Sequence, residues 1–223
     1  MGYYMIPKLF SDKFKKRMKE LNITVPQILG LHESKIVFYP FITGKGMQDI
    51  REVFKQTKED DTELMNYYSK YIRANMDLRE RALAISATVN QRITYKNDSS
   101  NYKKVEYWAK PIDVHRSGYD DCDGYSVLIC YLIRLFGAKE HEVFVATGDI
   151  NYPDGRTGGH AYVLILDENS LIFYPIEGSF YPNDARKKFW EVPHYLNKRY
   201  GKIWFVTNDF KSYSRIPWLR FVR

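Results

Sequence analysis

Cys122 lies at the boundary between an acidic turn and an apolar stretch, in the sequence SGYDDCDGYSVLICYLIRLFG of residues 117–137. If the apolar part forms a helix, Cys122 stands at the N-terminal end of that helix. Backbone N–H groups and the positive end of the helix dipole favour a thiolate there, and the same N–H groups could hold an oxyanion. The position therefore predicts a nucleophilic cysteine, with a structural thiol in a tight turn as the alternative.

His160 and Glu177 have the types and positions of a base and its orienting acid. A thiol nucleophile needs a base, and the base needs an acceptor that fixes its tautomer. His160 opens an apolar stretch after two glycines, and Glu177 ends the next one. If these stretches are strands that pair through the turn at 167–170, both side chains fall near the same end of a hairpin. His160 alone would be interpreted as a hydrogen-bonded strand histidine, but together with Cys122 and Glu177 it favours a catalytic set.

Other residues near Cys122 are assigned to structure rather than to chemistry. Cys130 lies inside the apolar stretch and is predicted to be a core residue. If one helix joins the two cysteines, they are about two turns apart, which is too far for a disulfide. The acidic residues Asp120, Asp121 and Asp123 lack the spacing of a calcium-binding loop, so the sequence predicts neither a metal nor a cofactor. Asp121 is expected to cap the helix instead.

The composition is that of a packed globular protein with a basic charge balance. The 223 residues are 44% hydrophobic and 16% aromatic, and the net charge is +7. Basic side chains gather in residues 8–20 and 211–223, where they either attract an acidic partner or form solvated faces. No nucleic-acid-binding motif accompanies them, so nucleic acid is not the predicted partner. No run of about 18 apolar residues and no signal-peptide pattern occurs, so we expect no membrane span and a cytoplasmic location.

Hydrophobic periodicity predicts helices first and strands later along the chain. The expected helices cover residues 12–20, 46–56, 61–75, 77–91 and 122–136. Residues 94–120 are expected to be loop-like. The expected strands cover residues 142–150, 159–167, 170–178 and 202–207, with turn-forming clusters between them. This order predicts an α+β fold in which a buried central helix packs on an antiparallel sheet.

Several of these residues occur in the order of a known pattern, over about residues 77–180. In chain order the matching residues are Trp108, Pro111, Asp121-Cys122-Asp123, Gly137, His160-Ala161-Tyr162 and Glu177. In this order the chain resembles the transglutaminase-like cysteine-enzyme superfamily. The resemblance implies a papain-like fold, with Cys122 as nucleophile, His160 as base and Glu177 as orienting acid. It places Asp121 and Trp108 in supporting positions.

Two positions depart from that pattern. Asp120 stands where the superfamily has a glycine before Asp-Cys, which changes the turn or the charge at the mouth of the site. Glu177 stands where aspartate is the commoner choice. Glutamate is one methylene longer, and it can orient the histidine equally well if its backbone lies slightly farther away.

The resemblance divides the chain into an N-terminal helical and irregular extension (1–76), a transglutaminase-like core (77–180) and a C-terminal extension packed on that core (181–223). It implies thiol-dependent hydrolysis, or acyl transfer, at an amide, peptide or isopeptide bond of a protein or peptide substrate. Hydrolysis is favoured because superfamily members outside the large animal enzymes are mostly peptidase-like. The alternative is a structural or assembly component, for example of a virus particle. Such a protein would keep the fold as a binding module and dock into a larger assembly through its basic, aromatic ends.

Overall fold

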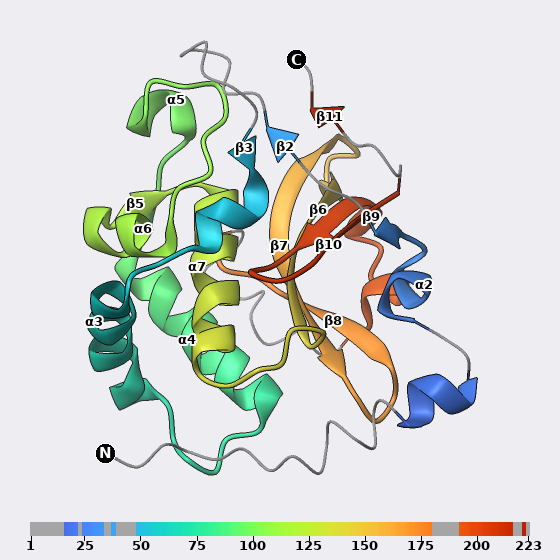
Figure 1. Ribbon diagram of the computed structural model, residues 1–223. Helices are drawn as coiled ribbons and strands as arrows, with labels where there is room; N and C mark the ends of the chain where they lie inside the picture. Colours follow the sequence, from blue (N-terminus) through green and yellow to red (C-terminus); the bar gives the residue numbers. More distant parts are fainter. Residues whose placement is uncertain are drawn as a thin grey trace.

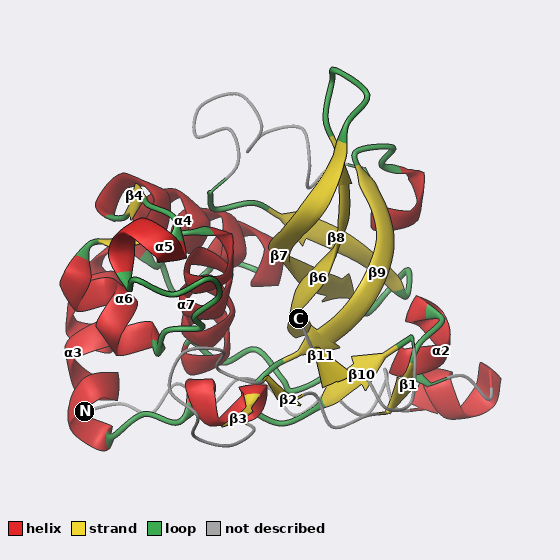
Figure 2. Ribbon diagram, turned by 90° about the horizontal axis from the view of Figure 1, so that it is seen from above, coloured by secondary structure: helices red, strands yellow, loops and turns green. Residues whose placement is uncertain are grey.

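Helices and strands occupy separate sides of the molecule. The computed structural model describes residues 16–21, 24–33, 37–38, 48–179, 192–215 and 220–221. In Figure 2 most helices lie on one side and a curved sheet lies on the other. Helix α7 (Cys122–Leu135) stands where the two sides meet, and it contacts both α4 (Leu78–Arg92) and the sheet (Figure 1). This arrangement confirms the α+β prediction.

Helices α4 and α7 follow the predicted ranges. The remaining helical segments of the described chain are residues 16–21, α2 (Val25–Leu29), α3 (Lys58–Tyr68), α5 (Asp98–Asn101), α6 (Pro111–Ser117) and the 3-10 helices Ile50–Phe54, Ser69–Tyr71 and His194–Leu196. At the start of α4, Asp77 accepts a hydrogen bond from the Glu80 backbone N–H at 2.8 Å, and Glu80 Oε2 accepts one from the Asp77 N–H at 3.0 Å. This capping box fixes the first turn. None of these helices has both the length and the apolar character that crossing a membrane requires.

The helices predicted near the N-terminus are only partly correct. Of the helix predicted over 12–20, residues 16–21 are helical and residues 12–15 lie outside the described residues. Of the helix predicted over 46–56, residues 46–47 lie outside the described residues, and the rest begins with a short strand, β3 (Gln48–Asp49), followed by a 3-10 helix that buries Ile50, Val53 and Phe54. The helix predicted over 61–75 begins earlier, at Lys58, because Thr57 and Asp60 form a capping box. It also ends earlier than predicted, at Tyr68, and the 3-10 helix Ser69–Tyr71 follows it.

The loop expected over residues 94–120 is wrong, because this segment contains regular structure. Helix α6 starts with Pro111, whose fixed φ suits the first helical position and whose missing N–H is not needed there. It ends at Gly118, which has a φ of 71° that glycine adopts without strain. Strand β4 (Thr94–Tyr95) pairs in parallel with β5 (Tyr119–Asp120). The chain is therefore held in place up to the residues just before Cys122.

Six strands form the main sheet, in the order β1-β10-β9-β6-β7-β8, and all their pairings are antiparallel. Besides β4 and β5, the strands are β1 (His32–Glu33), β2 (Val37–Phe38), β3 (Gln48–Asp49), β6 (Val143–Asn151), β7 (Thr157–Asp167), β8 (Ile172–Ile176), β9 (Tyr200–Thr207), β10 (Ser212–Ser214) and β11 (Arg220–Phe221). The predicted meander of β6, β7 and β8 is confirmed. The predicted strand at 202–207 is also present, and it joins the sheet beside β6 rather than beside β8.

Strand β7 has an apolar core on each of its faces. Val163 and Ile165 belong to the core between the sheet and the helices, whereas Tyr162 and Leu164 belong to a second core on the opposite face. Successive side chains of a strand point to opposite faces. A strand that is covered on both faces therefore has a continuous run of apolar residues, as β7 does.

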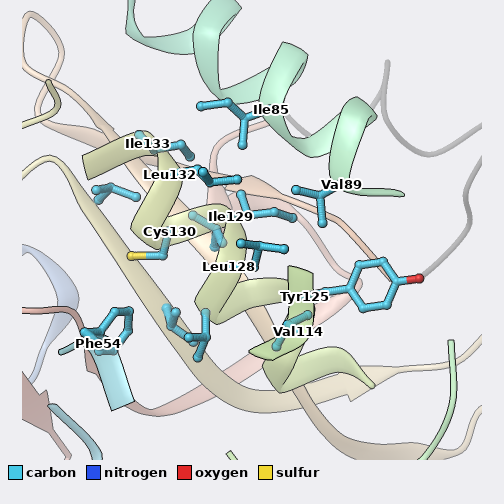
Figure 3. Packing of buried hydrophobic residues seen from close by; sticks show 14 of the residues in the cluster. Phe54, Ile85, Val89, Val114, Tyr125, Leu128, Ile129, Cys130, Leu132 and Ile133 are labelled. Atoms are coloured by element: carbon cyan, nitrogen blue, oxygen red, sulfur yellow. The ribbon is translucent and has the colours of Figure 1, made fainter. Parts of the chain in front are cut away.

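Helix α7 is fixed by packing along most of its length (Figure 3). Leu128, Ile129 and Leu132 are fully buried, and so is Cys130, which confirms its assignment as a core residue. Burying each large apolar side chain stabilises the fold by roughly 1.5–3 kcal/mol. The position of Cys122 at the N-terminal end of α7 therefore rests on a rigid element.

Candidate active site

Cys122 is the first residue of α7, as the sequence predicts. Asp121 caps the helix, since its carboxylate accepts a hydrogen bond from the Asp123 backbone N–H at 3.4 Å. The Ala161 backbone N–H of β7 lies near enough to the sulfur to act on the pKa of the Cys122 thiol. The thiol therefore meets β7 one residue after His160.

The surroundings of Cys122 favour a neutral thiol. Burial raises the pKa of the Cys122 thiol well above its ordinary value, and the charges of Asp123 and Asp121 raise it further. The nearby Ala161 backbone N–H lowers the pKa of the thiol but is a smaller effect. Burial and the two carboxylates therefore act against the thiolate that the helix N-terminus favours.

His160 and Glu177 form a buried, hydrogen-bonded pair. His160 Nε2 lies 2.9 Å from Glu177 Oε1. The side chains are 6% and 2% exposed, respectively. The register of the hairpin explains this contact. Val163 of β7 pairs with Ile176 of β8, so Glu177, the residue after Ile176, lies beside the β7 residues that directly follow His160. The two residues are thus brought together at one end of the hairpin, as the sequence predicts.

Helix α4 holds the backbone that carries Glu177. The Ser86 hydroxyl donates a hydrogen bond to the Glu177 carbonyl oxygen, and the Asn90 side-chain amide donates one to the Gly178 carbonyl oxygen. A residue that follows the end of a strand would otherwise be free to rotate. These two bonds from a packed helix therefore limit how far the Glu177 carboxylate can move away from His160.

Tyr200, the first residue of β9, is a site residue that sequence analysis missed. Its hydroxyl donates a hydrogen bond to Glu177 Oε1 at 2.8 Å, and this is the same oxygen that faces His160. Glu177 Oε2 has no hydrogen-bond partner among the described residues. Nothing in the sequence distinguishes Tyr200 from the other tyrosines of the chain, which has 19.

An aromatic layer surrounds the pair of His160 and Glu177. The Tyr162 ring stacks on His160 with ring centroids 6.1 Å apart. The Tyr162 hydroxyl lies 2.7 Å from His194 Nε2. Burial lowers the pKa of His194 to about 4, so this second histidine is neutral near physiological pH. The layer restricts water around Glu177 and strengthens the electrostatic contact with His160.

Trp108 lies in the core. Its side chain is 7% exposed, its ring centroid is 6.1 Å from that of Phe205, and its indole N–H donates a hydrogen bond to Glu106 Oε1 at 2.9 Å. The supporting position that the resemblance implies for Trp108 thus corresponds to packing contacts.

Four carboxylates gather beside Cys122. Asp98, Asp120, Asp121 and Asp123, the carboxylate cluster, each place one oxygen within 4.8 Å of the others. Burial raises the pKa of Asp98 to about 8 and that of Asp120 to about 7. Sequence analysis missed Asp98, because it lies in the polar segment of residues 97–101, far before the acidic turn in the chain.

Comparison with known proteins gives a fold. No family model and no curated protein sequence matches this chain. Calcium-bound LapG of Legionella pneumophila is similar in structure, with a TM-score of 0.53 and 10% sequence identity over 74% of this chain and 83% of LapG. A second LapG structure gives 0.52 at 11% identity over 74% and 85% of the two chains. EGTA-treated LapG gives 0.53 at 11% identity over 74% and 83%. The chain therefore has the transglutaminase-like fold that the sequence resemblance predicts.

Proposed function

We propose that this chain is a cysteine peptidase or amidase that hydrolyses an amide, peptide or isopeptide bond in a protein or peptide substrate. The observation that carries the proposal is the buried pair of His160 and Glu177, with 2.9 Å between Nε2 and Oε1. The backbone N–H of the next residue of the same strand, Ala161, lies near enough to the Cys122 thiol to act on its pKa. A base with its orienting acceptor beside a thiol is what a nucleophilic cysteine needs. The structural likeness to LapG supports the proposal at the level of the fold.

In the first half of the reaction, His160 removes the thiol proton as the Cys122 sulfur attacks the carbonyl carbon of the substrate. The hydrogen bond from Nε2–H to Glu177 assigns the proton transfer to the other ring nitrogen, Nδ1. The carbonyl oxygen becomes an oxyanion, which in this mechanism the Cys122 backbone N–H at the start of α7 stabilises. His160 then gives its proton to the leaving amine, and the acyl group remains on the sulfur as a thioester.

In the second half, water attacks the thioester while His160 again acts as the base. The acyl group leaves as a carboxylic acid, and Cys122 regains its proton. A lysine amine in place of water would give an isopeptide crosslink after the same first step. We favour hydrolysis because the superfamily members that the sequence resembles are mostly peptidase-like. Product analysis separates the two outcomes, since only hydrolysis produces a new carboxylic acid.

Alkylation of the thiols tests the proposed catalytic set. The purified full chain, His160→Ala and His194→Ala are treated with iodoacetamide near neutral pH, and the labelled cysteine is mapped by mass spectrometry. We expect selective labelling of Cys122, with a rate that falls by at least about tenfold in His160→Ala, because the thiol then has no base. His194→Ala is the matched control, since His194 bonds to Tyr162 and not to Glu177.

Cys130 provides an internal standard, because it is fully buried in the same chain and should react slowly in every variant. If Cys122 reacts at the rate of an ordinary free thiol and His160→Ala leaves that rate unchanged, the catalytic proposal is wrong. A protein that keeps the fold as a binding or assembly module would give that result.

A further inference from the structure

We propose that Tyr95 is a further catalytic residue, whose hydroxyl donates a hydrogen bond to the oxyanion that forms when Cys122 attacks a substrate carbonyl. This inference rests on the proposed function and adds a side-chain donor to its mechanism. Tyr95 is the last residue of β4, which pairs in parallel with β5. Because β5 leads directly into α7, Tyr95 lies beside the turn that carries Cys122.

The backbone fixes the position of Tyr95 relative to the start of α7. Tyr95 pairs with Asp120, two residues before the first residue of that helix. The Thr94 backbone N–H donates a hydrogen bond to the Gly118 carbonyl oxygen at 2.8 Å, and the Lys96 N–H donates one to the Asp120 carbonyl oxygen at 2.9 Å. These two bonds, one on each side of Tyr95, hold β4 against β5. The Tyr95 side chain therefore projects from a backbone whose place beside the site is set by the fold.

The Tyr95 phenol lies near the Cys122 thiol. Partial burial raises the pKa of the Tyr95 hydroxyl above its ordinary value, and negative charge on the Cys122 sulfur raises it further. Charges on Asp121, Tyr152 and Asp123 act in the same direction, each with a smaller effect than that of Cys122. Because the effect of one charge on another falls with distance, the phenol lies near the sulfur that would react. The raised pKa keeps the hydroxyl protonated near neutral pH, so that it can donate a hydrogen bond.

The Tyr95 hydroxyl is available to a substrate. The side chain is 55% exposed, and its hydroxyl has no hydrogen-bond partner among the described residues. Two other tyrosines close to this turn use their hydroxyls within the fold. Tyr102 donates to Asp120 Oδ2 at 2.8 Å, and Tyr125 donates to the Ile93 carbonyl oxygen. Of these three tyrosines, Tyr95 is the one whose donor remains for a ligand.

The site needs such a donor, because other polar groups near the thiol are either engaged or negatively charged. The Asp123 backbone N–H at the start of α7 already donates to the Asp121 carboxylate, at 3.4 Å. The indole N–H of Trp108 donates to Glu106 Oε1 at 2.9 Å. An oxyanion that forms beside the Asp121 and Asp123 carboxylates is repelled by them unless hydrogen-bond donors face it. Tyr95 provides a donor at this point.

The hydrogen bond from Tyr95 changes the energy of one intermediate and leaves the proton balance as it is. As the sulfur electron pair forms the C–S bond, the π electrons of the carbonyl move onto its oxygen, and the Tyr95 hydroxyl donates to that oxyanion while keeping its own proton. When those electrons re-form the C=O bond, the bond to the leaving amine breaks. The amine takes the proton that His160 removed from the thiol.

Two reagents that react with the same sulfur separate this role from a structural one. p-Nitrophenyl acetate acylates a thiol through a tetrahedral oxyanion and releases p-nitrophenolate, whereas iodoacetamide alkylates it by displacement of iodide and forms no oxyanion. The full chain, Tyr95→Phe and Tyr119→Phe are treated with each reagent near neutral pH, and modification of Cys122 is followed by mass spectrometry. The acetyl group has no side chain, so a change in its transfer cannot arise from a lost side-chain contact with the substrate.

We expect Tyr95→Phe to slow acylation of Cys122 by at least about tenfold. Loss of one donor from an oxyanion site slows acyl transfer by about 10²–10³-fold, and an activated ester needs less assistance than an amide. Alkylation of Cys122 and the unfolding temperature should be those of the parent chain, because the Tyr95 side chain is exposed and its hydroxyl has no partner among the described residues. Tyr119 is the matched control, since it lies in the same two-stranded sheet and is 46% exposed. Tyr119→Phe should keep both rates.

An acylation rate that Tyr95→Phe leaves unchanged overturns the assignment of Tyr95. An equal fall in acylation and alkylation also overturns it, because Tyr95 would then act on the thiol or on the fold. The His160→Ala variant shows which proposal has failed. If alkylation of Cys122 depends on His160 while acylation does not respond to Tyr95→Phe, only the assignment of Tyr95 is wrong. If neither reaction of Cys122 depends on His160, the proposed function is wrong, and the assignment of Tyr95 is wrong with it.

Discussion

Replacing Tyr200 with phenylalanine tests how the proposed orienting acid is held. The change removes one hydroxyl, which donates a hydrogen bond to Glu177 Oε1 at 2.8 Å. The carboxylate would then keep only its bond to His160, with Oε2 still lacking a partner among the described residues. Tyr200→Phe should therefore both destabilise the fold and loosen the pair of His160 and Glu177.

The size of the effect follows from the charge of the acceptor. A hydrogen bond to a charged group stabilises a protein by about 1.5–3 kcal/mol, whereas one between neutral groups contributes about 0.5–1.5 kcal/mol. The Glu177 side chain is 2% exposed, so water cannot replace the lost donor. Tyr200→Phe should thus lower the free energy of unfolding by about 1.5–3 kcal/mol in the wild type and by about half as much in Glu177→Gln.

A double-mutant cycle measures this difference. Urea unfolding of the wild type, Tyr200→Phe, Glu177→Gln and the double variant should give a coupling energy of about 1 kcal/mol. Tyr213→Phe is the matched control, because the Tyr213 ring packs on Phe144 and its hydroxyl has no hydrogen-bond partner among the described residues. Its effect should stay within about 0.5 kcal/mol. Additive effects of Tyr200→Phe and Glu177→Gln would refute the idea that Tyr200 acts through the Glu177 charge.

Two further predictions concern the turn and the pH dependence. Gly124→Ala should lower the free energy of unfolding by about 1–3 kcal/mol, because its Cβ would lie 2.1 Å from Asp120 Cγ. In urea unfolding, the double variant with Asp120→Gly should recover part of this loss, and no recovery would contradict this explanation. Burial and Arg92 lower the pKa of His115 to about 4, from an ordinary value of 6.5. Between these two pKa values the unfolded chain binds a proton that the folded chain does not. The free energy of unfolding should therefore fall by about 1–3 kcal/mol as the pH drops from 6.5 to about 4. His115→Gln should lose less stability over the same pH range. If the stability of His115→Gln depends on pH as that of the wild type does, His115 is not the source of the pH dependence.

The elements that the sequence predicts well are those with strong local signals. Helix α7 has a long apolar run and a capping aspartate, and the hairpin of β7 and β8 has two apolar stretches separated by a short turn. Helix α6 has only seven residues, and its first residue, Pro111, is also common in loops, so its segment was expected to be loop-like. The position of β9 beside β6 could not be predicted, because pairing between distant strands depends on the whole sheet.

The candidate site also contains both residues that the sequence predicts and residues that it does not. His160 and Glu177 could be predicted as partners, because the register of one hairpin brings them together. Tyr200 and Asp98 could not be predicted, because each reaches its partner from a distant segment and neither belongs to a motif. The raised pKa of the Cys122 thiol was also missed, since the helix dipole is visible in the sequence while burial is not.

Asp120 shows how the fold accommodates a departure from the superfamily pattern. Its side chain is fully buried, where a glycine at this position would leave space, and it is held by hydrogen bonds from the Tyr102 hydroxyl and the Asp121 backbone N–H. The room for this carboxylate exists because residue 124 is a glycine, since a Cβ there would collide with Asp120. Asp120 also adds a buried carboxyl group beside that of Asp98, and burial raises the pKa of Asp120 to about 7. A residue that packing alone accommodates thus has an electrostatic cost, which protonation of the buried carboxyl groups reduces.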